Sequence, residues 1–263
     1  MLGLEFPGIN EVIRWVDLFP TFNKIALIAV AATLIGSWLF IKAAKTDHTV
    51  APTGVRNFAE VTVEFIEEMV LETIGREGLK WTPYMLALFI FIYLCNLPGI
   101  IPVLYMPATA RMAIPLFLAV LVWLIYIGVG IRHQGIRYFT HMLWPPGVPT
   151  FLKPLVGVIE IVSNIFVRPF ALAIRLFANM LAGHMLLVTF SVLTHELILG
   201  GAIAKPIAIL PFFMLLFVTA FEVLVGFLQA YIFTILACVF IASSLESHDE
   251  HDEAPAVTLA EAH

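Results

Sequence analysis

Charged residues and cysteines are both scarce in this 263-residue chain. Lys, Arg, Asp and Glu together make up 13% of the residues and apolar residues make up 61%, which excludes a soluble globular domain of this length. Six acidic residues lie in the last eighteen positions and account for the net charge of -5. The remainder is near neutral and has no basic stretch, so we expect no nucleic-acid partner.

The two cysteines, Cys95 and Cys238, lie far apart in apolar segments, and neither has a second Cys or a close His as a ligand partner. This pattern is typical of small buried side chains rather than of a metal site. The acidic stretch after position 245 contains His and Asp, but its composition is that of a disordered tail. We therefore expect no cofactor and no metal.

The chain consists mainly of long apolar runs. Residues 25–41 lie between two lysines, a second run starts at Pro83, and a third covers about 113–131. The last two runs, 155–193 and 206–245, would each form a helix roughly 60 Å long, about twice the thickness of the hydrocarbon core. Such helices must tilt, bend or break, and Pro169 is a candidate kink.

These patterns predict an all-α polytopic membrane protein with about five crossings, the last two very long, steeply tilted and paired as an antiparallel hairpin. Apolar and acidic residues alternate in 52–80 in the manner of an interfacial amphipathic helix, with Phe58, Val61, Phe65 and Met69 as its apolar face. We expect five regions: an amino-terminal segment with the first span (1–51), the interfacial helix (52–80), two spans and their connection (81–153), the long hairpin (154–245) and the acidic tail (246–263).

Lys and Arg residues alternate between rich and poor connections along the chain. Their numbers are two before the first span, then five, one, three and one in the successive connections, and none in the tail. The positive-inside rule therefore predicts five crossings with the amino terminus outside and the carboxyl terminus in the cytoplasm.

Several polar side chains interrupt the two long runs, and ionisable groups inside a membrane are functional candidates. In an antiparallel hairpin, residues at equal depth have a constant index sum. His184 with Glu222 gives 406 and Arg175 with Gln229 gives 404, so both pairs centre the hairpin in the connection near residue 202. Asn179 lies four residues after Arg175 and on the same helix face.

Chemistry suggests different roles for these groups. His184 beside Glu222 is a candidate proton relay, because both side chains take up and release protons. Arg175 stays charged and cannot relay protons, but it can attract a carboxylate and repel a passing cation. His184 is nine residues from Arg175 and so faces the opposite side of an ideal helix. Further candidates for lining a proton path are Glu160, Ser163, Asn164, His195 and Glu196.

Three functions fit these observations. The first is a proton-conducting subunit. The second is a secondary transporter in which Arg175 binds a substrate anion; it would require repeated halves or broken helices, which the sequence does not show. The third is a structural membrane scaffold in which Arg175 only pairs with a carboxylate of this chain.

The segments RLFANMLAGH (175–184) and FEVLVGFLQAYIFTIL (221–236), together with NLPGIIP (96–102), resemble subunit a of the F-type ATP synthase. The likeness covers most of 52–245. It implies a non-catalytic subunit of the Fo motor, with two offset aqueous half-channels leading to the carboxylates of the c-subunit ring. Arg175 would be the fixed arginine that separates the half-channels.

The resemblance assigns the other site residues as well. Asn179 and Gln229 would be polar neighbours of the arginine, and His184 and Glu222 would be channel residues in the order that mitochondrial members have. Glu160 resembles an upstream acidic residue; it lies fifteen residues before Arg175, where several members have fourteen.

The implied partners are the c-ring, the b-subunit peripheral stalk, other Fo and F1 subunits and the lipid bilayer. We expect a bacterial plasma membrane, with an organellar energy-transducing membrane as the alternative.

Overall fold

The computed structural model describes residues 17–19, 22–45, 54–101, 107–135, 151, 153–200 and 204–245. Its elements in chain order are β1 (Asp17–Phe19), β2 (Phe22–Asn23), α2 (Lys24–Ala44), α3 (Val55–Thr73), the 3₁₀-helix η1 (Arg76–Trp81), α4 (Thr82–Asn96), the 3₁₀-helices η2 (Leu97–Gly99) and η3 (Ala108–Ala110), α5 (Ala113–Gln134), α7 (Lys153–Val162), the π-helical turn η4 (Ser163–Val167), α8 (Arg168–Leu199), α9 (Ala204–Ile207) and α10 (Ile209–Leu245). The acidic tail lies outside the described residues.

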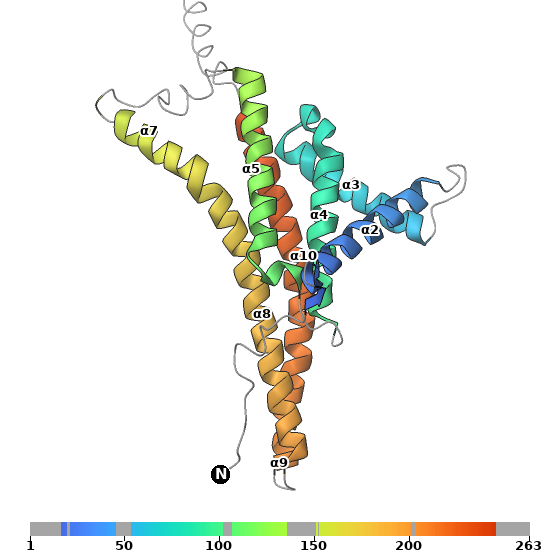
Figure 1. Ribbon diagram of the computed structural model, residues 1–263. Coiled ribbons are helices and arrows are strands. Elements are labelled where there is room, and N and C mark those ends of the chain that lie inside the picture. Colours follow the sequence, from blue (N-terminus) through green and yellow to red (C-terminus); the bar gives the residue numbers. More distant parts are fainter. Residues whose placement is uncertain are drawn as a thin grey trace, which may run out of the picture.

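Five helical stretches are long and apolar enough to cross a membrane, as predicted: Ala26–Ala44, Arg76–Gly99, Ala113–His133, Lys153–Leu199 and Lys205–Leu245. The short antiparallel pair β1 and β2 was not predicted. The last two stretches span 47 and 41 residues, and α8 packs beside α10 as an antiparallel hairpin (Figure 1). This confirms an all-helical membrane fold dominated by a long carboxyl-terminal hairpin.

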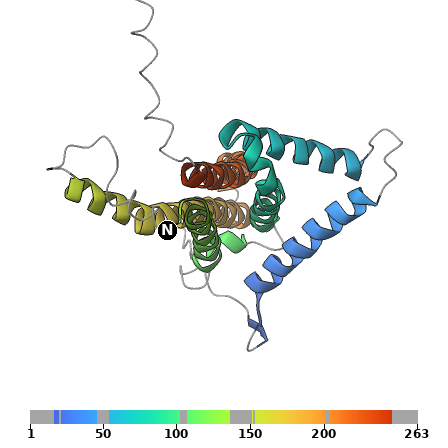
Figure 2. The ribbon, with the colours of Figure 1, turned by 90° about the horizontal axis from the view of Figure 1, so that it is seen from above.

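The long helices do not remain together along their full length. α7 leans away from α5 and α10, whereas the lower part of α8 runs beside α10 (Figure 1). Seen from above, α4, α5 and α10 point along the view, while α2 and α3 lie across it (Figure 2). The amino-terminal helices α2 and α3 therefore run across the direction of the bundle, and α3 packs against α4 and α10.

The core lies where α3, α4, α5, α8 and α10 meet. Met85, Tyr126, Leu176 and Phe233 are among its fully buried side chains. Helices can bury such side chains without strain because all interior backbone groups are bonded within the helix. The core therefore fixes α8 against α10 near the predicted polar residues.

Helix α3 forms within the segment predicted to be an interfacial amphipathic helix. Its glutamates are exposed, as expected. The buried side chains include Ile66 and Val70, whereas Phe58 and Val61 are 52% and 56% exposed. Phe65 contacts aromatic rings of α4 and α10. Ile66 and Val70 therefore pack into the core, while Phe58 and Val61 of the predicted apolar face remain exposed on the surface of the chain.

Candidate functional site

Arg175 lies on a stripe of exposed residues along α8. No hydrogen bond or ion pair joins its guanidinium to another residue in the described part of the chain. Its neighbours on the stripe are small or apolar apart from one amide: Ala171, Ile174, Ala178, Asn179 and Ala182. The alanines leave room for a second helix to approach closely. A permanent charge is thus presented outward on an otherwise largely apolar surface.

The surface of α10 toward the hairpin connection is apolar and aromatic. Phe213, Phe217 and Phe221 are 61%, 65% and 53% exposed. An unpaired cation on an apolar surface is costly inside a bilayer, so Arg175 is a candidate functional residue.

Asn179 links the two long helices one turn after Arg175. Its Nδ2 donates to Oε1 of Gln229 on α10 at 2.8 Å. Gln229 is 2% exposed, and its own Nε2 has no partner among the described residues. The sequence paired Gln229 with Arg175 by depth; its hydrogen-bond partner is Asn179, on the same face of α8.

Glu222 is the second buried polar group of α10. The residue is 4% exposed, and neither carboxyl oxygen has a hydrogen-bond partner within the described residues. It faces Gly183 of α8, where a Cβ atom would lie 3.3 Å from Oε1. Glu222, Gly183 and Asn179 all line a cavity of about 260 Å³ between the helices. A buried acid without a partner, next to a space for water, is suited to exchanging protons.

His184 is buried, at 3% exposure, and follows Gly183 in the chain. It therefore lies at nearly the same depth as Glu222, in agreement with the predicted hairpin register. Arg175 is exposed whereas His184 is buried, as expected for residues nine apart on one helix. His184 does not line the cavity that Glu222 lines.

The remaining predicted site residues lie away from this group. Glu160 is half-buried in α7, and Ser163 and Asn164 form part of the π-helical turn. His195 is exposed and Glu196 half-buried, about three turns beyond His184. The structure thus joins Asn179 to Gln229 and places Asn179 and Glu222 on one cavity. Arg175 lies one turn before Asn179 on the exposed stripe, His184 is buried beside Gly183, and the other candidates lie at either end of the long helix.

One buried polar contact was missed by the sequence analysis. Asn96, at the end of α4, donates from Nδ2 to the carbonyl of Gly226 at 3.3 Å, and Thr109 Oγ1 donates to Asn96 Oδ1 at 2.5 Å. Gly226 lies between Glu222 and Gln229 on the same buried face of α10. The sequence places Asn96 at the start of the NLPGIIP segment, and an amide within an apolar span was the signal for a tertiary contact.

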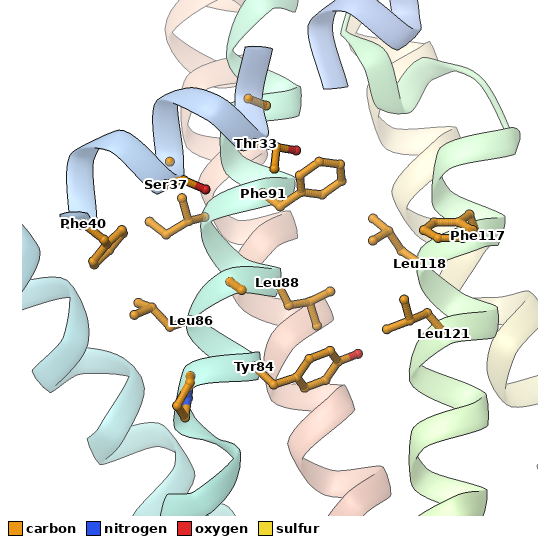
Figure 3. Close-up of a pocket in the computed structure, with 15 residues that line it drawn as sticks. Thr33, Ser37, Phe40, Tyr84, Leu86, Leu88, Phe91, Phe117, Leu118 and Leu121 are labelled. Atoms are coloured by element: carbon orange, nitrogen blue, oxygen red, sulfur yellow. The ribbon is translucent and has the colours of Figure 1, made fainter. Parts of the chain in front are cut away.

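A larger apolar cavity lies between α2, α4 and α5, with a volume of about 490 Å³ (Figure 3). Its polar lining consists of Thr33, Ser37 and Tyr84, and none of the predicted site residues contributes to it. Within the described residues there is also no group of three or more His, Cys, Asp or Glu that could hold a metal ion. The polar group between α8 and α10 is therefore the candidate site.

Comparison with known proteins shows the family of this chain. A family model described as ATP synthase A chain matches residues 25–242. The chain is 41% identical over 241 residues to ATP synthase subunit a of Frankia alni, covering 90% of this chain and 81% of that protein. It is 38% identical over 233 residues to ATP synthase subunit a of Bartonella bacilliformis, covering 89% and 90%. The chain therefore belongs to the ATP synthase subunit a family.

Proposed function

We propose that this chain is the proton-conducting stator subunit of an ATP synthase Fo motor, in which Arg175 separates two offset aqueous half-channels that lead to the carboxylates of a c-subunit ring. The observation that carries the proposal is the outward-facing, unpaired guanidinium of Arg175 on an apolar stripe. A scaffold role would instead pair Arg175 with a carboxylate of its own chain.

The attraction between Arg175 and a carboxylate is of a size that suits a rotor that must bind and then move on. An arginine and a carboxylate 4 Å apart attract each other by about 4 kcal/mol at an effective dielectric constant of 20. This attraction holds an ionised rotor carboxylate near Arg175, and protonation of the carboxylate releases it. Because Arg175 itself does not give up its proton, it blocks direct proton passage between the half-channels.

The buried groups serve the path to the rotor. Glu222 and His184 lie at one depth and pass protons, while Asn179 and Gln229 form a fixed polar bridge beside the arginine. Each elementary charge that crosses gains about 2.3 kcal/mol per 100 mV, so several crossings are needed for one ATP. The chain itself carries out no bond chemistry and acts as a component of the complex.

The setting follows from the family and from the charge pattern. We expect the c-ring, the b-subunit peripheral stalk and other Fo and F1 subunits as partners. We also expect a bacterial plasma membrane, with the amino terminus outside and the carboxyl terminus in the cytoplasm.

The test compares two arginines of the same helix in the assembled complex. Arg175→Ala should abolish ATP synthesis and ATP-driven proton pumping in membrane vesicles without loss of the subunit from the purified complex. Arg168 packs its guanidinium over the Phe240 ring at 5.2 Å, so Arg168→Ala is the matched control and should retain transport. Normal coupled synthesis in the Arg175→Ala complex would overturn the proposed function.

A further inference from the structure

The long helix changes its hydrogen-bonding pattern for one turn, at Ser163–Val167. The backbone N–H of Arg168 donates to the carbonyl of Ser163, five residues earlier, instead of to that of Asn164. The next residue, Pro169, has no N–H to donate. The carbonyl of Asn164 therefore receives neither the donor of an α turn nor the donor of a π turn.

Helix α5 supplies the missing donors. Trp123 Nε1 donates to the Asn164 carbonyl at 3.2 Å, and the Tyr126 hydroxyl donates to the same oxygen at 2.5 Å. The two aromatic residues are three apart and share one face of α5. Tyr126 is 1% exposed and Asn164 is 7% exposed. One buried side chain, Tyr126, and one partly buried side chain, Trp123, thus donate to a backbone oxygen that has no donor within its own helix.

This turn determines which way the upstream part of the helix faces. A π turn holds one residue more than an α turn, and one residue corresponds to about 100° of rotation in an α-helix. Glu160 precedes the turn and Arg175 follows it. Glu160 and Arg175 are fifteen residues apart, and the π turn takes up one of these residues without adding to the rotation. The remaining fourteen place Glu160 about 40° from Arg175 around the helix axis. A continuous α-helix would instead place Glu160 about 60° from Arg175, on the opposite side of it.

We propose that Trp123 and Tyr126 are positioning residues for the proton path: they hold the Asn164 carbonyl and so fix the π turn that sets the direction of Glu160 relative to Arg175. The part assigned to Glu160 and Arg175 rests on the proposed function. The link between the two aromatic donors and the direction of Glu160 does not depend on the proposed function, and it can be measured separately.

The first experiment measures geometry in the assembled complex. Single cysteines at positions 159, 160 and 161, in a chain whose Cys95 and Cys238 are replaced by alanine, are labelled in membranes with a water-soluble maleimide. We expect the fastest-labelled position to change, or the three rates to become similar, when Trp123→Phe and Tyr126→Phe are introduced together. Tyr126→Phe removes only the hydroxyl donor, and Trp123→Phe removes the N–H donor while keeping a smaller aromatic ring. An unchanged labelling order would overturn the inference and leave the proposed function intact.

The second experiment is a rescue. In the doubly substituted chain, Val167 is deleted and Pro169 is replaced by alanine. The deletion removes the extra residue of the π turn, so a continuous α-helix points Glu160 in the original direction. The alanine N–H then donates to the Asn164 carbonyl as in an ordinary α turn. We expect ATP-driven proton pumping to fall about tenfold or more in the double variant, since small misplacements of reacting groups have effects of this size. The deletion should restore both pumping and labelling order.

If the Trp123→Phe, Tyr126→Phe subunit does not assemble into the complex, the deletion is tested by whether it restores assembly. If the deletion restores neither assembly, pumping nor labelling order, the register explanation is wrong. Arg175→Ala serves as a separate control, since it tests the proposed function without changing either aromatic residue.

Discussion

Replacing Glu222 with methionine tests whether its buried carboxyl group is kept for function at the expense of stability. Both oxygens are buried without a hydrogen-bond partner in the described part of the chain. Burying a polar group without compensation costs about 1–3 kcal/mol in protein mutational data. Methionine has a similar length, so Glu222→Met removes this cost without enlarging the cavity of about 260 Å³.

We therefore expect Glu222→Met to raise the free energy of unfolding of the subunit by about 1–3 kcal/mol, and to reduce coupled proton transport severely. Stability is measured by denaturant unfolding of the detergent-solubilised complex, and transport by ATP-driven acidification of vesicles. Thr219→Val is the matched control, because its hydroxyl already donates to the Leu215 carbonyl at 2.7 Å. The control should not increase stability and should leave transport unchanged.

Two results would refute this reasoning about Glu222. A destabilised Glu222→Met subunit would mean that the carboxyl group has a favourable partner in the assembled complex, such as a bound water. A stabilised subunit with normal transport would show that the acid is not part of the proton path.

Two other buried contacts give sharp predictions. A Cβ at Gly183 would lie 3.3 Å from Oε1 of Glu222, so Gly183→Ala should reduce proton pumping slightly, and the branched Gly183→Val about tenfold or more; equal pumping by the two variants would contradict a steric effect. Asn96→Leu removes the hydrogen bonds with the Gly226 carbonyl and Thr109, and should lower the free energy of unfolding by about 1–3 kcal/mol. Thermal unfolding of the complex measures this loss, and an unchanged midpoint would show that the contact does not hold α10.

The large features of the fold were predictable because a membrane leaves few solutions. Backbone groups in lipid must be bonded within a helix or a closed barrel, so each long apolar run had to be helical. The depth of His184 relative to Glu222 followed from chain indices alone, since both helices rise by the same amount per residue. The contact between Glu222 and Gly183 confirms that register.

What could not be predicted depends on donors and acceptors from distant segments. Pro169 marked a possible kink, but the π turn before it is completed by Trp123 and Tyr126, about forty residues earlier. Likewise, the hydrogen bond from Asn96 reaches Gly226 across 130 positions. A local pattern shows that a backbone or side-chain group needs a partner, but it does not show which helix provides it.

Three contacts on the buried face of α10 fix how this helix packs in the hairpin. Glu222, Gly226 and Gln229 follow one another on its buried face, and each meets a different residue: Gly183, Asn96 and Asn179. These contacts fix the depth and rotation of α10 against α8 and α4. Arg175, on the other side of α8 from His184, makes no polar contact with any residue that the structure describes. Under the proposed function, this outward-facing guanidinium is the group that meets a carboxylate of the c-ring, and Arg175→Ala tests that role.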